Sequence, residues 1–265
     1  MNLTDNMLSS ARDNTDYNFF PLWRTFPSII TLFALCLGLH SIKLTSHNKW
    51  EASVISIIGA AFLDGIDGRI ARLLGCSSVF GAQLDSLADF LNFGVAPALL
   101  IYFIFLTKIK VFGWSMVTVF VICMAIRLAR FNTNITYGNN KDGWRCNFFY
   151  GIPAPAAAVL IMLPVILSFK ELEYSEIFIK QNYVLAHVAF VSVLTVSHLP
   201  TFSLKKIKIH KCFISPLLLC FGIAAISLIV KPWIAIPVFS VLYIVSIPFS
   251  MVYYYVQYKK EKNFN

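Results

Sequence analysis

Long apolar segments recur along the whole chain and limit what it can fold into. Eight segments, nearly free of charge and separated by polar or basic stretches, cover residues 28–42, 50–63, 81–106, 111–126, 151–169, 182–199, 212–230 and 233–252. A helix needs roughly 20 apolar residues to cross the ~30 Å hydrocarbon core of a bilayer, and it satisfies its own backbone hydrogen bonds there. The second segment is short, but it can continue as a helix through residue 72. The sequence therefore predicts an all-α fold, a polytopic bundle of membrane-spanning helices.

The composition excludes an ordinary soluble domain. Of the 265 residues, 58% are hydrophobic and only 13% are charged, with a mean hydropathy of +0.71. The formal net charge is +9, but lysine and arginine lie largely between and beyond the apolar segments. That distribution is typical of membrane topology, and no nucleic-acid partner is expected. The six cysteines form no C-x-x-C pair, so neither a disulfide framework nor a zinc site is predicted.

The positive charges also predict an orientation. With both termini in the cytosol, the segments on the inner side carry 15 lysines and arginines and those on the outer side carry 7. Cytoplasmic loops are enriched in these residues, so the bias supports this orientation. It places residues 64–72 and 127–145 on the same, cytosolic side of the membrane.

Acidic residues are concentrated in one stretch. Of thirteen in the chain, only four lie between residues 52 and 141, and these are Asp64, Asp67, Asp85 and Asp89. Helical spacing places Asp64 and Asp67 on one face of a helix, and Asp85 and Asp89 on one stripe of the next. If these helices face each other, the carboxylates meet, and a divalent cation is the natural compensation for their burial near a bilayer. Ligands that are all oxygen favour Mg²⁺ or Mn²⁺ over Zn²⁺.

Glycines and arginines in the same stretch favour phosphate chemistry. Gly68 and Gly81 have no side chain, which lets a phosphate group approach the backbone closely. Arg72 carries a planar guanidinium suited to phosphate oxygens. The alternative is that the carboxylates are simply ion-paired between helices. Because only Arg69 and Arg72 are available in the stretch for four acids, phosphoryl chemistry with a metal is the favoured interpretation.

Residues 64–89 resemble the signature of the CDP-alcohol phosphatidyltransferase family. The signature is D-x2-D-G-x2-A-R-x8-G-x3-D-x3-D, and the chain matches it at every fixed position. The resemblance implies an integral membrane enzyme that displaces CMP from a CDP-linked lipid with an alcohol, commonly with two divalent cations and as a homodimer. It assigns metal ligation to Asp64, Asp67, Asp85 and Asp89, and it makes Asp89 the catalytic base. It assigns contacts with the CDP-lipid to Gly68, Ala71, Arg72 and Gly81.

Two further strings resemble the phosphatidylserine synthase branch of this family. They are R-L-A-R-F-N at residues 127–132 and F-Y-G-I-P-A-P-A at residues 149–156, and Pro27, Thr31 and Gly38 resemble its opening motif, although Ser28 stands where asparagine is usual. The branch uses CDP-diacylglycerol and L-serine, in the bacterial inner membrane with the active site facing the cytoplasm. A serine carboxylate needs a cation, so Arg127 and Arg130 are candidate serine-binding residues, with Asn132 beside them. On physical grounds alone, the arginines could equally be ordinary residues of an inner membrane boundary.

The resemblance covers the six-helix core at residues 27–200. Residues 1–26 are expected to form a cytosolic and interfacial segment, and residues 201–265 two additional transmembrane helices and a basic tail, without an assigned role. Two alternatives remain open. A sister transferase would use glycerol 3-phosphate or inositol phosphate as acceptor. An ion-coupled transporter would place its carboxylates near the midplane, in two repeat-related halves, whereas here they cluster at one end of one helix pair.

Overall fold

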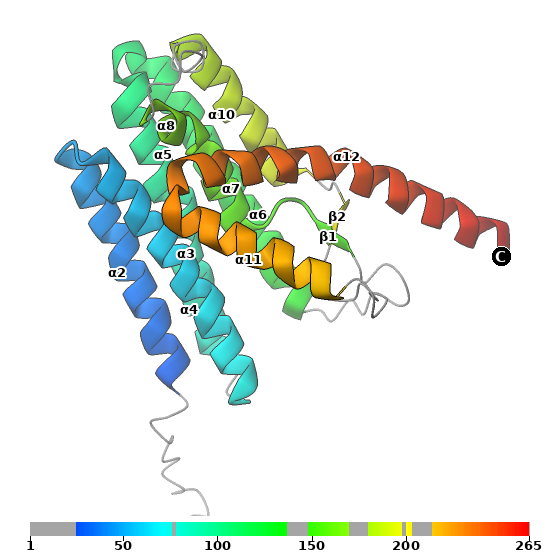
Figure 1. The fold of residues 1–265 in the computed structure, drawn as a ribbon. Helices are drawn as coiled ribbons and strands as arrows, with labels where there is room; N and C mark the ends of the chain where they lie inside the picture. The colour runs from blue at the N-terminus through cyan, green and yellow to red at the C-terminus, as the bar shows by residue number, and fades with distance from the viewer. Residues whose placement is uncertain are drawn as a thin grey trace, which may run out of the picture.

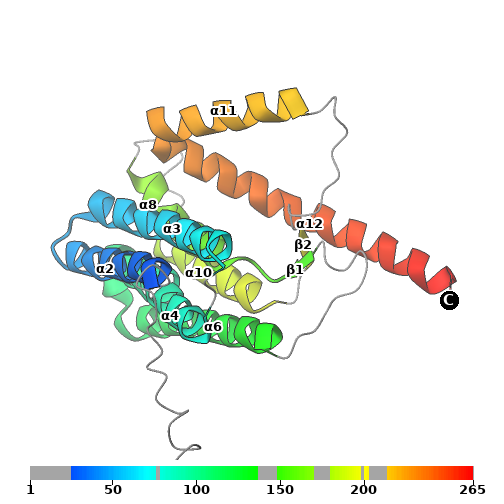
Figure 2. The ribbon, with the colours of Figure 1, turned by 90° about the horizontal axis from the view of Figure 1, so that it is seen from below.

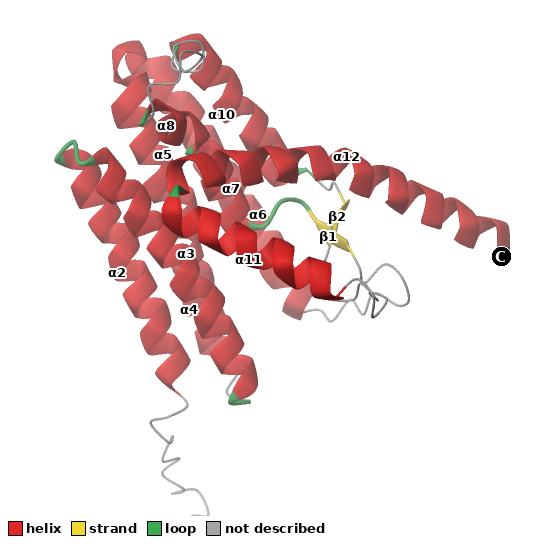
Figure 3. Ribbon diagram, in the orientation of Figure 1, coloured by secondary structure: helices red, strands yellow, loops and turns green. Residues whose placement is uncertain are grey.

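The computed structural model describes residues 25–75, 78–136, 148–169, 180–197, 200–202 and 214–264. Helices dominate these residues and pack side by side in a bundle (Figures 1 and 3). The predicted segment at residues 1–26, the lysines of residues 205–211 and the polar loop with Lys141 and Arg145 lie almost wholly outside the described residues. Within them, the helices follow the eight predicted ranges, so the all-α prediction is confirmed. The division into segments 1–26, 27–200 and 201–265 stays a prediction.

The first two helices form a hairpin. Helix α2 covers Phe26–Ser46 and begins with Pro27 in its first turn, where a missing backbone N–H removes no hydrogen bond. Helix α3 covers Trp50–Leu73, and Asn48 adopts a positive φ of 59° in the turn between them. Near this turn the buried Ser53 hydroxyl lies 2.8 Å from the hydroxyls of both Ser41 and Thr45. These contacts satisfy polar groups inside an apolar interface and fix how the two helices pack.

The third predicted helix is uninterrupted from residue 79 to residue 106, but the number of residues per turn changes along it. Helix α4 covers Val79–Asp89, a π-helical turn (η2) covers Phe90–Val95, α5 covers Ala96–Ile101, a second π-helical turn (η3) covers Tyr102–Leu106, and a 3₁₀ turn (η4) covers Thr107–Ile109. The amide of Ala96 bonds to the carbonyl of Leu91, five residues back, directly before Pro97. Proline cannot donate the next helical hydrogen bond, so the local change of winding falls where the sequence predicts a bend.

The middle of the chain packs around helix α6, which covers Lys110–Thr136. Helices α7 (Ala154–Ile161) and α8 (Leu163–Ser168) take the place of one predicted span, and α10 covers Gln181–Val196. The break at Met162 follows from Pro164, which cannot donate to the carbonyl of Leu160. His187 on α10 hydrogen-bonds to that carbonyl through Nε2 at 2.8 Å. His187 is thus a packing residue that satisfies this carbonyl.

Two short strands lie beside this part of the bundle. Strand β1 covers Phe148–Tyr150 and strand β2 covers Pro200–Phe202, and they pair antiparallel with Phe149 opposite Thr201. The pairing brings the chain before α7 alongside the chain after α10. A Cβ atom on Gly151 would lie 3.0 Å from the carbonyl oxygen of Ser197, which shows how closely these two junctions approach.

The last two helices lie along one side of the bundle. Helix α11 covers Ile214–Val230 and α12 covers Pro232–Phe264, and Figure 2 shows α12 between α11 and the other helices. Trp233 at the start of α12 packs edge-to-face on Phe169 after α8, with ring centroids 5.0 Å apart. The α12 helix runs beyond the predicted end near residue 252, since no proline or glycine interrupts the polar residues that follow.

The core combines side chains from nearly all of these helices. Phe93, Leu100, Phe120, Met124 and Ile161 are among the largest fully buried side chains. Many large apolar side chains are exposed on the outer faces of α2, α6, α11 and α12, as expected where lipid is the solvent. In the described part of the chain, three stretches are long and apolar enough to cross a membrane: Phe26–Ser46, Val79–Thr133 and Pro232–Tyr255.

Candidate active site

Helices α3 and α4 bring the predicted carboxylates together. Asp64 and Asp67 on α3 and Asp85 on α4 each offer one carboxylate oxygen, and these oxygens lie within 4.8 Å of one another. Asp89 is the last residue of α4, one turn beyond Asp85, and its carboxyl group lies within hydrogen-bonding range of Asp64. All four predicted acids therefore belong to one cluster, in which the first three form the tightest group.

The donor set of this cluster fits a hard divalent cation. Its ligands are carboxylate oxygens from two helices, and this is the chemistry that Mg²⁺ and Mn²⁺ prefer. Arg69 and Arg72 are exposed at the end of α3. Arg127 on α6 interacts electrostatically with Asp89. One guanidinium beside four clustered acids leaves an excess of negative charge that a bound cation would balance.

Thr31 on α2 positions one of the carboxylates. Its hydroxyl donates to Oδ2 of Asp67 at 2.6 Å and also lies 3.1 Å from the carbonyl oxygen of Pro27. Asp67 is only 3% exposed, so a hydrogen bond to its charge is worth more there than in water. The sequence analysis used Thr31 only as part of a string, because nothing in its spacing shows a contact with a residue on another helix.

The predicted phosphate-contacting residues lie around the end of α3 and the start of α4. A Cβ atom on Gly68 would meet nothing within 4 Å, so the packing of the protein does not require a glycine there. The Nε of Arg72 donates to the carbonyl oxygen of Gly68 at 2.9 Å, which holds the guanidinium along α3. Ser78 begins α4 by accepting a hydrogen bond from the amide of Gly81 at 2.9 Å. A Cβ on Gly81 would lie 3.7 Å from the hydroxyl of Ser28, so the starts of α4 and α2 are close neighbours.

The predicted serine-binding residues lie at the end of α6. The Nε of Arg127 donates to the carbonyl of Ile152, and Arg130 donates to the carbonyl of Val196 through a terminal nitrogen. Both arginines thus hold the paired junctions before α7 and after α10. Asn132 accepts a hydrogen bond from the hydroxyl of Ser86 on α4 at 3.0 Å, which ties α6 to the helix that carries two of the acids.

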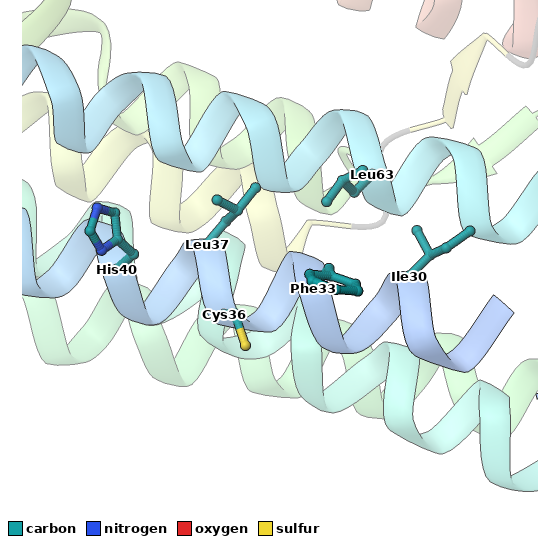
Figure 4. A pocket seen from close by; sticks show the side chains of 6 residues that line it. All are labelled: Ile30, Phe33, Cys36, Leu37, His40 and Leu63. Atoms are coloured by element: carbon teal, nitrogen blue, oxygen red, sulfur yellow. The ribbon is translucent and has the colours of Figure 1, made fainter. Parts of the chain in front are cut away.

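An apolar groove lies along α2 and α3. Its volume is about 610 Å³, and its wall is almost entirely apolar: Ile30, Phe33, Cys36, Leu37, His40 and Leu63. Figure 4 shows five of these side chains following α2 while Leu63 comes from α3. Leu63, on the α3 side of the groove, directly precedes Asp64 in the chain.

Comparison with known proteins decides the family. The family model described as CDP-alcohol phosphatidyltransferase matches residues 24–195, which include the complete acidic cluster. The chain belongs to the CDP-alcohol phosphatidyltransferase family. The prediction made from residues 64–89 is therefore confirmed, and family membership favours a transferase over the transporter alternative.

Several members of the family are similar to this chain over most of its length. A protein of Mycobacterium tuberculosis strain H37Rv is 35% identical over 226 residues, which cover 85% of this chain and 77% of the relative. One of Helicobacter pylori strain 26695 is 38% identical over 226 residues, covering 83% and 88%. One of Bacillus subtilis is 34% identical over 143 residues, covering 54% and 75%. Each is named CDP-diacylglycerol–serine O-phosphatidyltransferase.

The C-terminal hairpin also carries a family match. A second family model, described as CDP-alcohol phosphatidyltransferase 2, matches residues 213–248, which cover α11 and half of α12. The sequence analysis limited the resemblance to residues 27–200, because the catalytic motif lies there. The hairpin has no comparable motif of charged residues, and its match gives no role to individual side chains.

Proposed function

We propose that this protein transfers the phosphatidyl group of CDP-diacylglycerol to the hydroxyl of L-serine, giving phosphatidylserine and CMP. The observation that carries the proposal is the cluster of four carboxylates on α3 and α4 with Arg127 of α6 beside it. Relatives named as serine-using transferases support the choice of acceptor. A multi-pass protein of the bacterial inner membrane, with its active site facing the cytoplasm, would meet both substrates there.

Asp64, Asp67 and Asp85 would hold the divalent cation, Mg²⁺ or Mn²⁺, and Asp89 would contact a second ion. Metal ions in such a site neutralise the pyrophosphate and stabilise the leaving phosphate. Thr31 keeps Asp67 oriented toward the ligand position. The helices would hold these four carboxylates in place and leave most of them without a cationic side-chain partner, so that they could bind metal ions.

Asp89 would act as the general base. The hydroxyl of serine is a weak nucleophile at neutral pH, so a carboxylate must accept its proton as its oxygen attacks the lipid-linked phosphorus. The new bond joins the serine oxygen to this phosphorus. The bond from phosphorus to the CMP oxygen breaks, and CMP leaves with the electron pair. Asp89 then holds the proton that serine lost.

The CDP-lipid would lie along the end of α3 and the start of α4. Gly68, Ala71, Arg72 and Gly81 would contact its nucleotide and pyrophosphate, with Arg72 supplying positive charge. The open space at Gly68 supports this assignment, because a ligand would explain a glycine that packing does not require. The acyl chains would lie in the apolar groove of α2 and α3, whose lining includes Leu63, the residue before Asp64.

The serine would bind between the acidic cluster and the end of α6. Arg127 interacts with Asp89, so a carboxylate held by Arg127 would bring the serine hydroxyl close to the base. Arg130 and Asn132 would complete the pocket from the same helix. If Arg127→Ala and Arg130→Ala both leave the KM for serine unchanged, this placement is wrong. A homodimer, as in relatives of the family, is the proposed assembly.

The decisive experiment measures CMP release from purified protein in detergent. CDP-diacylglycerol and Mn²⁺ or Mg²⁺ are supplied with serine, glycerol 3-phosphate or inositol phosphate, each in turn. We expect serine-dependent release that disappears on removal of metal with EDTA, returns when metal is restored, and falls by a factor of about 100 or more in Asp89→Asn. Glu51→Gln is the matched control, since Glu51 is an exposed acid at the other end of α3.

The other outcomes are equally informative. Release with glycerol 3-phosphate or inositol phosphate alone would keep the family and replace the acceptor. Serine-dependent release that survives in Asp89→Asn would remove Asp89 from the role of base. Release that persists after complete removal of metal would contradict the assignment of Asp64, Asp67 and Asp85 as ligands.

A further inference from the structure

Helix α12 directs a stripe of side chains, including Tyr243, into the bundle. Ile236, Ser240 and Ile247 are buried at 9%, 5% and 5% exposure, and Tyr243 lies on the same helical stripe. Its ring packs against the hydrophobic core. Its hydroxyl oxygen is buried and has no hydrogen-bond partner among the described residues. Burying an unpaired hydroxyl destabilises the folded state, so such a group calls for an explanation.

Tyr243 interacts with a residue of the candidate active site. Its hydroxyl interacts electrostatically with Arg127, and Arg127 in turn interacts with Asp89. Arg127 donates through its Nε to the carbonyl of Ile152, and this bond fixes the guanidinium, whose terminal nitrogens make no hydrogen bond within the part of the chain that the structure describes. Three interacting groups thus come from three helices. They are the proposed base Asp89 on α4, the cation Arg127 on α6 and the phenol of Tyr243 on α12.

The geometry points to a specific role for Tyr243, which rests on the proposed function. Its hydroxyl donates a hydrogen bond to the carboxylate of the acceptor, which Arg127 holds at the same time. Tyr243 is thus a substrate-contacting residue that selects a carboxylate-bearing alcohol. The C-terminal hairpin, to which the sequence analysis gave no role, completes the acceptor site.

The chemistry of the two groups favours this ligand. A guanidinium has only donors, and a phenol is a good donor to a negatively charged oxygen. A guanidinium and a phenol from different helices that both donate to one carboxylate would satisfy its two oxygens. The amino acid L-serine carries its hydroxyl one carbon beyond the atom that bears the carboxylate. A carboxylate between Tyr243 and Arg127 would therefore leave the hydroxyl free to reach Asp89.

The anchoring of α12 supports a fixed position for the phenol. Trp233 packs on Phe169 ten residues before Tyr243, and Ile236 and Ile247 belong to the main hydrophobic core. A side chain held on both sides by buried neighbours loses little conformational freedom when it binds a ligand. The hydroxyl is thus preorganised by the hairpin rather than recruited on binding.

The test is the substitution Tyr243→Phe in the full-length protein, which keeps the ring and removes only the hydroxyl. We expect the KM for serine to rise about tenfold or more, because a hydrogen bond to a charged group is lost. The KM for CDP-diacylglycerol and the thermal midpoint in detergent should remain close to those of the unsubstituted protein. The matched control is Tyr255→Phe on the exposed face of the same helix.

A second experiment distinguishes a direct contact between Tyr243 and the serine carboxylate from a general disturbance of the active site. Serinol and ethanolamine retain a hydroxyl and an amine but lack the carboxylate, so as competitors of serine they should have the same inhibition constants in Tyr243→Phe and in the unsubstituted protein. An unchanged KM for serine would overturn the proposal. So would equal rises in the KM for both substrates, or equal weakening of serine and the two competitors.

CMP release by the unsubstituted protein distinguishes failure of the proposed function from failure of the proposal for Tyr243. If that protein releases CMP with another acceptor and not with serine, the proposed function fails and the proposal for Tyr243 fails with it. If serine-dependent release is present and Tyr243→Phe leaves all constants unchanged, only the proposal for Tyr243 fails.

Discussion

At the scale of single residues, the orientation of Asp67 depends on Thr31. The Thr31 hydroxyl is 2.6 Å from the Asp67 carboxylate, and Thr31 precedes Asp67 by 36 residues in the sequence. Partners that orient a metal ligand commonly affect metal affinity by ~10–100-fold. We expect Thr31→Val to raise the Mn²⁺ concentration for half-maximal CMP release by about tenfold or more, with a much smaller effect on the rate at saturating metal.

The comparison for this prediction uses two variants. Thr31→Ser retains the hydroxyl and should titrate with Mn²⁺ like the unsubstituted protein. Thr118→Val removes a hydroxyl that bonds only to the carbonyl of Trp114 on the exposed face of α6, so it should change nothing. Identical Mn²⁺ titrations for Thr31→Val and Thr118→Val would show that the hydrogen bond does not position Asp67.

The four carboxylates themselves could be predicted from the sequence, while their partners could not. Asp64, Asp67, Asp85 and Asp89 have helical spacing on consecutive helices, so periodicity alone brings them together. Thr31 lies on the preceding helix and Tyr243 on the last helix, and no periodicity relates them to the acids. Contacts of this kind depend on how helices pack, which a single sequence does not specify.

At the scale of helices, the approach of the η2 turn to α2 depends on Gly38. A Cβ atom at this position would lie 1.9 Å from Oδ1 of Asn92, whose side chain is fully buried. Overpacking of a buried site typically costs about 1–3 kcal/mol. We expect Gly38→Ala to lower the thermal midpoint of the protein in detergent by several degrees, because α2 must move away from η2.

A second substitution distinguishes this clash from the ordinary effect of replacing glycine in a helix. Asn92→Ala removes the nearest atom that Gly38→Ala would meet and leaves Leu91 Cδ2 at 2.8 Å, so the double variant should recover part of the lost stability. Gly222→Ala on α11 is the matched control, since a Cβ there meets nothing within 4 Å, and it should be neutral or stabilising. Additive losses in the double variant would contradict the proposed contact.

The helices could be predicted from the sequence better than their interruptions. Apolar segments separated by polar stretches gave all eight helical regions, because length and hydrophobicity are properties of the segment itself. The break at Met162 and the π-helical turn at Phe90–Val95 each follow from a single proline and from local packing. A proline in an apolar run shows that a hydrogen bond is lost, but it does not show whether the helix bends, widens or stops.

At the scale of the whole molecule, the position of α11 and α12 could not be predicted. Both segments were recognised as apolar helices, yet hydrophobicity does not show which face of the bundle a helix joins. The packing of Trp233 on Phe169 places α12 beside α7 and α8, so that its stripe with Tyr243 faces the core. A hairpin that looks like a simple extension of the sequence therefore belongs to the same packed unit as the acidic cluster.

The orientation of the molecule in the membrane is also open to test. The excess of positive charge predicts that both termini and the acidic cluster lie in the cytosol, and that residue 48 and the turn at Lys231 lie outside. Helix α11 has 17 residues, the lower end of the range of roughly 17–25 that spans a bilayer. We expect green fluorescent protein to fluoresce when fused after residue 265, and alkaline phosphatase to be active when fused after residue 48 or residue 231.

The fusion after residue 231 decides how the hairpin lies. The phosphatase fused after residue 231 is active only if α11 begins in the cytosol and crosses the membrane. In that case α12 also lies in the membrane, and so does Tyr243. An inactive phosphatase at residue 231, with an active one at residue 48, would mean that α11 does not cross. An inactive phosphatase at residue 48 with an active one fused after residue 265 would reverse the whole orientation. It would also place the acidic cluster on the side of the membrane opposite to a cytosolic supply of serine.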